Sequence, residues 1–141
     1  MTRSKVTARV GQCRAQSLRN IMEVRNMIII KIKLRGTAES RELEFKFEDG
    51  PYPIDQANKL KNVPGVYVIL CQDSSSSRVI DVGQSDDVRK RVTNHDRKDC
   101  WRKHCRQESL KVAATHISDE QQRLSLEKEI RQHRKPPCGE Q

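Results

Sequence analysis

Apolar and polar positions alternate in two segments near the start of the chain. Residues 27–35 begin with an apolar run and then alternate aliphatic with basic side chains, and residues 41–47 alternate Leu and Phe with charged side chains. Successive side chains of a β-strand point to opposite faces, so this period of two predicts two strands that each bury one face. Gly, Thr and Ser occur between them, and we therefore expect a β-hairpin.

Further strands and helices are predicted in the second half of the chain. Residues 65–71 (GVYVILC) are apolar almost throughout, which indicates a strand covered on both faces. Strands are also expected over residues 78–82 and 109–116, and helices over residues 55–61, 85–95, 99–106 and 118–134. Ser85 and Ser118 are the predicted N-caps of two of these helices, and Gln121 would complete a capping box. The stretch Asp49–Pro53 is expected to be a turn.

This order of elements predicts an α/β (α+β) fold, with a small central antiparallel β-sheet flanked by helices. We divide the chain into a basic flexible tail (1–26), a hairpin with its connector (27–62) and a main domain (63–139). The tail has six basic residues and one acid, so it supplies more than half of the net charge of +9. A basic chain suits nucleic acid first and an anionic membrane second.

The apolar runs and the cysteine spacing indicate in which compartment of the cell the protein is expected. No run approaches the roughly 20 apolar residues that cross a bilayer, and no apolar segment typical of a signal peptide is visible near the start. Five cysteines without a Cys-x-x-Cys pair predict no disulfide framework, and a cytoplasmic location is expected. Cys100, His104 and Cys105 could bind zinc with Cys138 or His133, but their spacing is unusual for zinc and favours ordinary packing.

Two helical stretches contain candidate catalytic residues. Arg91 and His95 are four residues apart, and on one face of a helix they could hold a phosphate and move a proton, or simply face solvent. Glu127 falls within a mostly apolar arc bounded by Leu124, Leu126 and Ile130. A carboxylate on a buried face needs a cation, so we expect either a salt bridge or a divalent metal there.

Taken together, four motifs in residues 63–139 resemble the GIY-YIG nuclease family. They are Gly65-Val66-Tyr67, Asp81-Val82-Gly83, the pair Arg91 and His95 eight and twelve residues past Gly83, and Glu127 nine residues before Pro136. The resemblance covers a little over half of the chain. It implies a metal-dependent endonuclease that hydrolyses phosphodiester bonds in nucleic acid, with DNA as the expected substrate.

The resemblance also implies roles for these residues. Glu127 would bind one Mg²⁺ or Mn²⁺, and Arg91 would hold the phosphate oxygens as charge builds. Tyr67 would take a proton from the attacking water, provided that a cation such as Arg91 lowers its pKa. His95 would relay a proton or orient the water.

Departures from the family pattern leave a second interpretation open. Asp81 replaces the second motif tyrosine, where it could aid a metal or mark lost activity, and Gly139 replaces an asparagine. A catalytically degenerate module that binds nucleic acid or a protein partner without cleavage is therefore the alternative.

Trp101 is expected either to stack on a base or to pack in the core, and a protein partner could supply specificity. The expected nucleic-acid contacts are Ser85, Arg89, Arg97, Lys98, Arg102 and Lys103.

Overall fold

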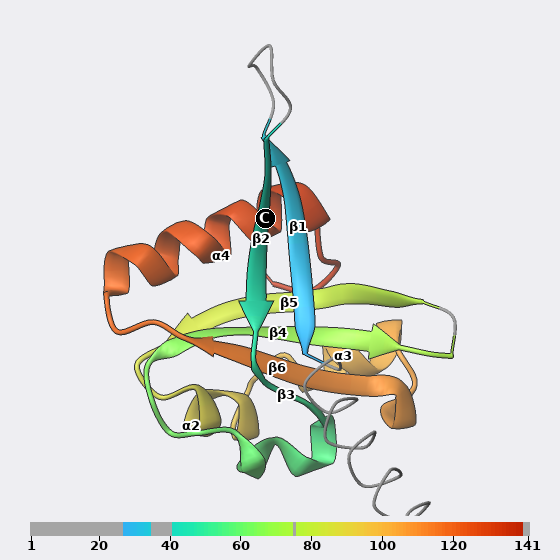
Figure 1. Cartoon of the computed structure of the whole chain (residues 1–141). Coiled ribbons are helices and arrows are strands. Elements are labelled where there is room, and N and C mark those ends of the chain that lie inside the picture. Colours follow the sequence, from blue (N-terminus) through green and yellow to red (C-terminus); the bar gives the residue numbers. More distant parts are fainter. Residues whose placement is uncertain (1–26, 35–40, 75, 140–141) are drawn as a thin grey trace, which may run out of the picture.

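A computed structural model describes residues 27–34, 41–74 and 76–139 of the chain (Figure 1). The tail and the turn of the hairpin lie outside these residues, so the expectation of a flexible tail is not addressed. The strands are β1 (Ile28–Leu34), β2 (Arg41–Phe47), β3 (Asp49–Pro53), β4 (Gly65–Gln72), β5 (Ser77–Ser85) and β6 (Leu110–His116). The helices are the 3₁₀ helices η1 (Ile54–Lys59) and η2 (Gln107–Ser109), and the α-helices α2 (Val88–Thr93), α3 (Lys98–His104) and α4 (Glu120–Arg134).

Four antiparallel strands form the central sheet, in the order β3-β6-β4-β5. The central strand β4 pairs with β5 on one side and with β6 on the other. Tyr67 of β4 lies opposite Gly83 of β5 and opposite Ala114 of β6. The predicted antiparallel sheet flanked by helices is confirmed.

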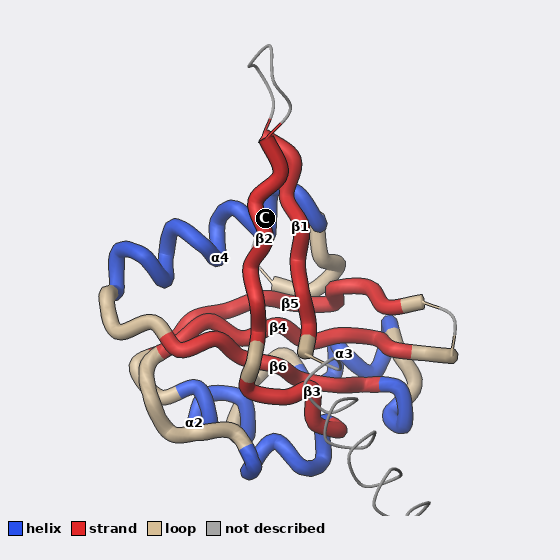
Figure 2. Tube along the Cα trace, in the orientation of Figure 1, coloured by secondary structure: helices blue, strands red, loops and turns tan. Residues whose placement is uncertain are grey.

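Separate apolar layers cover the two faces of this sheet. Tyr67 and Ile69 pack with residues of η1, α2 and α3, whereas Val66 and Val68 pack with α4 and the hairpin. Figure 2 shows α2 and η1 on the opposite side of the strands from α4. The alternation of a strand explains why one short segment contributes to both layers.

The β1–β2 hairpin lies across one face of the sheet (Figure 1). Ile30, Ile32 and Phe47 are buried in the layer that also contains Val68 and Ile130, whereas Ile29 is 45% exposed. The hairpin therefore shares a core with the main domain. The division between residues 27–62 and 63–139 remains a prediction from the sequence.

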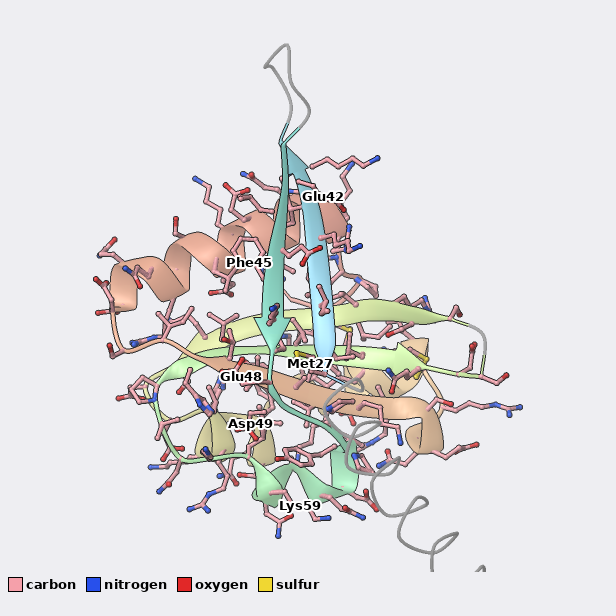
Figure 3. The ribbon with its side chains drawn as sticks, in the orientation of Figure 1. Met27, Glu42, Phe45, Glu48, Asp49 and Lys59 are labelled. Carbon is pink, nitrogen blue, oxygen red and sulfur yellow. A yellow bond between two sulfur atoms is a disulfide. The ribbon has the colours of Figure 1, made fainter. Side chains whose placement is uncertain are left out.

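A buried carboxylate anchors the passage from the hairpin into the sheet. Asp49 follows β2 at the first position of β3 (Figure 3). It accepts hydrogen bonds from the Tyr52 hydroxyl at 2.9 Å and the Lys61 amide at 3.0 Å, and it pairs with His116 Nε2 at 3.0 Å. The stretch predicted to be a turn is thus the edge strand β3, which pairs with β6.

Both predicted N-caps are displaced toward a later aspartate. Asp87 caps α2 by accepting from the Lys90 amide, while Ser85 ends β5. Asp119 caps α4 by accepting from the amides of Gln121 and Gln122. An aspartate caps at least as well as a serine, so serine was the wrong choice where both occur within two residues. None of the described helices is long and apolar enough to span a membrane.

Two disulfides contradict the prediction that the cysteines form no bridges. Cys71 pairs with Cys105 and Cys100 pairs with Cys138, with Cα–Cα distances of 5.7 and 5.9 Å. The partners are 34 and 38 residues apart, so no local spacing could reveal them. Both bridges tie α3 and the residue that follows it to the rest of the domain.

Candidate active site

The Tyr67 side chain is buried against a glycine of the neighbouring strand. A Cβ atom at Gly83 would lie 2.2 Å from the Tyr67 hydroxyl oxygen and 2.4 Å from Cζ. The ring therefore occupies the space that any other side chain would need. This contact gives the glycine of the second motif a physical role, which is to admit the tyrosine of the first.

His95 lies behind Tyr67, just past the end of α2. Its Nε2 atom is 2.8 Å from the Tyr67 hydroxyl oxygen, and its Nδ1 atom accepts a hydrogen bond from the Arg97 amide at 3.0 Å. Burial, together with the nearby charges of Arg97 and Arg91, lowers the pKa of His95 to about 4. The ring is thus neutral near pH 7, and because Nδ1 accepts, Nε2 carries the proton and donates to Tyr67.

Burial also dominates the acidity of Tyr67. It raises the pKa of Tyr67 to about 12, although the charge of Arg91 acts in the opposite direction. Arg91 thus lowers the pKa of Tyr67, as expected, but not enough to bring this pKa near neutral pH. In the free protein, the condition set for Tyr67 as a base, a pKa lowered by a cation, is therefore not met by Arg91 alone.

A pocket of about 1100 Å³ brings together residues from β4, β5, the α2–α3 region and α4. Tyr67, Arg91 and Glu127 line it, whereas His95 reaches it only through Tyr67. Its other lining residues are Gly83, Gln84, Arg97, Leu124, Lys128, Arg131, Gln132, Lys135 and Pro136. Three of the four predicted catalytic residues therefore meet at one surface, although 60 residues separate Tyr67 from Glu127.

Glu127 has a cationic partner on its own helix. Arg131 Nε lies 3.5 Å from Glu127 Oε1, one helical turn along α4. Burial raises the pKa of Glu127, and Arg131 partly offsets this effect. The side chain is 22% exposed and faces a pocket in which no other described residue offers a carboxylate. One carboxylate with room for water fits Mg²⁺, which keeps several water ligands.

Asp81 is the centre of a buried network of hydrogen bonds and ion pairs. Its carboxylate accepts from Arg97 Nε at 2.9 Å, Trp101 Nε1 at 2.8 Å and Arg131 Nη2 at 3.3 Å. The side chain is fully buried and its oxygens are occupied, so the expectation that it could aid a metal is wrong. Trp101 is only 1% exposed and packs in the core, which is the second of the two alternatives expected for it.

Arg131, which no sequence motif indicated, connects Glu127 to this network. Its guanidinium donates to the carbonyls of Val82 and Cys138 and packs over Gly139. A Cβ at Gly139 would lie 2.4 Å from Arg131 Nη1, and this glycine has φ +100°. The glycine in place of the family asparagine thus leaves room for Arg131. Its spacing of four residues from Glu127 was the signal that could have revealed it.

The predicted nucleic-acid contacts are only partly brought together. Arg97 lines the pocket, but Ser85, Arg89, Lys98, Arg102 and Lys103 do not. Lys98 donates to the Thr93 carbonyl, and Arg102 pairs with Asp99. The pocket instead gathers five cations against the single carboxylate of Glu127, which favours a polyanionic ligand. These cations are Arg91, Arg97, Lys128, Arg131 and Lys135.

The fold and the basic pocket define a small nuclease-type α/β domain. The family model of the GIY-YIG catalytic domain matches residues 63–140, more than half of the chain. The protein therefore belongs to the GIY-YIG family, whose nucleases generally depend on a metal ion and act on nucleic acid. Neither a curated protein nor a solved structure matched the chain.

Proposed function

We propose that this protein is a metal-dependent endonuclease that hydrolyses phosphodiester bonds in DNA. The observation that supports this proposal is the convergence of Tyr67, Arg91 and Glu127 on one strongly basic pocket. A phosphate bound in this pocket would lie near cations from the α2–α3 region and from α4 and its end. A location in the cytoplasm and a protein partner that supplies specificity remain predictions.

Glu127 is the residue that would hold one Mg²⁺ or Mn²⁺. When bound, such an ion stabilises negative charge on the phosphate and on the leaving oxygen. Arg131 lies 3.5 Å from one oxygen of the same carboxylate and therefore limits how the carboxylate can turn. We assign Arg131 the role of orienting Glu127 toward the pocket.

Arg91 and Arg97 are the groups that would bind the phosphate oxygens. The Arg91 side chain is 39% exposed and can adjust to a ligand, whereas Asp81 fixes the guanidinium of Arg97. A cation held in advance stabilises the charge of the transition state without rearranging. Arg91 would thus make an adjustable contact with the phosphate, and Arg97 a fixed one.

Tyr67 would orient the attacking water. His95 Nε2 donates to the phenol oxygen, so the phenol hydroxyl hydrogen is free to point into the pocket. With a pKa of about 12, the phenolate is scarce near neutral pH. We therefore assign Tyr67 positioning of water before proton transfer, and we assign His95 positioning of Tyr67.

Two observations favour the second candidate, a module of the same fold that binds nucleic acid or a protein without cutting. With a pKa of about 12, Tyr67 is almost entirely protonated near neutral pH and is therefore rarely available as a base. The ion pair with Arg131 competes with a metal for Glu127. Both functions use the same basic pocket, so only a cleavage experiment separates them.

A cleavage assay on plasmid and branched DNA, with and without Mg²⁺ or Mn²⁺, tests the proposal. We expect Glu127→Gln to abolish cutting and leave binding nearly intact, because it keeps the size and removes the charge. Glu129→Gln is the matched control, since Glu129 lies on the same helix beside His133 and does not line the pocket. A wild-type protein that binds DNA, cuts none of these substrates and is indifferent to Glu127→Gln would establish the binding module instead.

A further inference from the structure

A histidine lies beside the Cys100–Cys138 disulfide. The two sulfur atoms and a ring nitrogen of His104 all lie within 4.8 Å of one another. Cys100 and His104 are four residues apart at the two ends of one turn of α3, so the helix presents both on the same side. Cys138 comes from the segment that follows α4. None of the three lines the pocket that contains Glu127.

Two thiolates and one imidazole form a donor set that suits Zn²⁺. Zinc binds cysteine sulfur at about 2.3 Å and histidine nitrogen at about 2.0–2.1 Å, so a tetrahedral site needs ligand atoms roughly 3.4–3.8 Å apart. The three atoms lie within 4.8 Å of one another, so small side-chain movements after reduction, including separation of the two sulfurs, would bring them to that spacing. Hard cations such as Mg²⁺ prefer oxygen and would not compete.

His104 is available for such a role. Its side chain is exposed and makes no hydrogen bond or ion pair within the part of the chain that the structure describes. Cys138 is 1% exposed and Cys100 is half-buried. An ion bound here would be held by protein on the cysteine side and open to water on the histidine side.

We propose that Cys100, His104 and Cys138 bind one Zn²⁺ when the Cys100–Cys138 bridge is reduced, with water as the fourth ligand. A dithiol reductant, which is itself oxidised to a disulfide, transfers two electrons and two protons to the bridge, and zinc then displaces the two thiol protons. The same junction between α3 and the C-terminal segment is therefore closed by a disulfide under oxidising conditions and by zinc under reducing ones.

This junction holds two walls of the basic pocket. Arg97 directly precedes α3, and Lys135 and Pro136 lie just before Cys138. Trp101, next to Cys100, donates to the buried Asp81. A reduced chain without zinc would lose this covalent link between the parts and keep only the non-covalent contacts through Asp81, whereas zinc would restore a direct link.

Cobalt substitution in the full chain tests this site without relying on cleavage. A Cys13→Ser background removes the one cysteine outside the described residues. The protein is reduced in urea with a phosphine, which becomes the phosphine oxide, and is refolded without metal, after which its four free thiols are counted. We expect one Co²⁺ per chain with a thiolate charge-transfer band and tetrahedral visible bands, both lost on adding one equivalent of Zn²⁺. A carboxylate site at Glu127 cannot give the thiolate band.

Matched variants decide which residues are responsible. Loss of a supporting group costs a metal site about 10–100-fold in affinity, so His104→Ala should weaken zinc binding by at least about tenfold. His133→Ala, on α4, should leave it unchanged, and Cys71→Ser with Cys105→Ser should retain the band. Refolding only in the presence of zinc would also support the site. The absence of a thiolate band, a band lost with Cys71 and Cys105, or equal zinc affinity in the two histidine variants would overturn it.

Discussion

The carboxylate of Asp81 holds two arginines at the wall of the basic pocket. Arg97 and Arg131 both bind it and both line the pocket. Taking charges out of water is costly, and good geometry with further hydrogen bonds is needed to offset that cost. The Trp101 indole and the Val82 amide provide those bonds at 2.8 Å each. Asp81 thus acts on the ligand only through the arginines it positions.

We expect Asp81→Asn to destabilise the fold by about 3–5 kcal/mol, because it removes the buried charge that pairs with the half-buried guanidinium groups of Arg97 and Arg131. Urea unfolding measures this change. Asp86→Asn is the control, since Asp86 is exposed in the loop before α2 and should change stability by less than about 0.5 kcal/mol. Asp81→Tyr restores the family residue, but we expect it to destabilise the protein because the space is filled. Similar midpoints for Asp81→Asn and Asp86→Asn would contradict this role.

His95 should make stability depend on pH in the acidic range. Its pKa falls from 6.5 to about 4 on folding, so between these values the unfolded chain binds the proton more tightly. Stability is therefore fully present above about pH 6.5 and is lost as the pH falls toward 4, by up to about 1.4 kcal/mol per pH unit. Unfolding in urea from pH 7 to pH 4.5 measures the slope, and His95→Gln should flatten it. An equal slope in both proteins would show that other groups are responsible.

Motif spacing was sufficient to predict Tyr67, Arg91 and Glu127 at one surface, because the motif fixes their order on strand and helix. It could not predict Asp81 as a centre of ion pairs. The partners of Asp81 are 16, 20 and 50 residues away, and only the folded chain brings them together. The same reason applies to the two disulfides.

At the scale of elements, the period of the apolar residues predicted the strands and helices that bury one regular face. The strands over residues 41–47 and 65–71 and the end of α4 at Arg134 are confirmed, to within a residue. The edge strand β3 was missed because Gly50, Pro51 and Pro53 are typical of turns. An edge strand tolerates proline, since not all of its amides pair. Short elements with few apolar residues depend on their neighbours and leave little pattern.

The hairpin offers a test of whether it belongs to the same folding unit as the sheet. Ile30 is 3% exposed and Ile29 is 45% exposed, on opposite faces of β1. We expect Ile30→Ala to cost about 2–5 kcal/mol of the unfolding free energy and Ile29→Ala less than about 0.5 kcal/mol. Tryptophan fluorescence reports the transition, because Trp101 lies in the layer across the sheet from the hairpin. If Ile30→Ala leaves the midpoint of the fluorescence transition unchanged, the hairpin unfolds separately from the sheet.

At the scale of the whole molecule, two groups of basic residues bear on the binding of nucleic acid, one in the pocket and one in the tail. The pocket gathers cations at fixed positions around Glu127. The tail, outside the described residues, has six basic residues along 26 positions. Fixed cations can select a geometry, whereas charges spread along a tail act on any phosphate backbone nearby. The two sets should therefore contribute differently to binding and to cleavage.

Removal of residues 2–26 separates these contributions. The dependence of log K on log salt has a slope of about −0.9 for each phosphate neutralised on duplex DNA. If all six basic residues of the tail contact phosphate, truncation should reduce the slope by about five. Arg91→Ala removes one contact and should reduce it by about one. Fluorescence anisotropy of a labelled duplex between about 50 and 200 mM salt measures both. Truncation should weaken binding to all sequences alike and leave the cleavage rate at saturating DNA unchanged, because it leaves Tyr67, Arg91 and Glu127 in place. A slope that truncation does not change would show that the tail makes no contact with DNA.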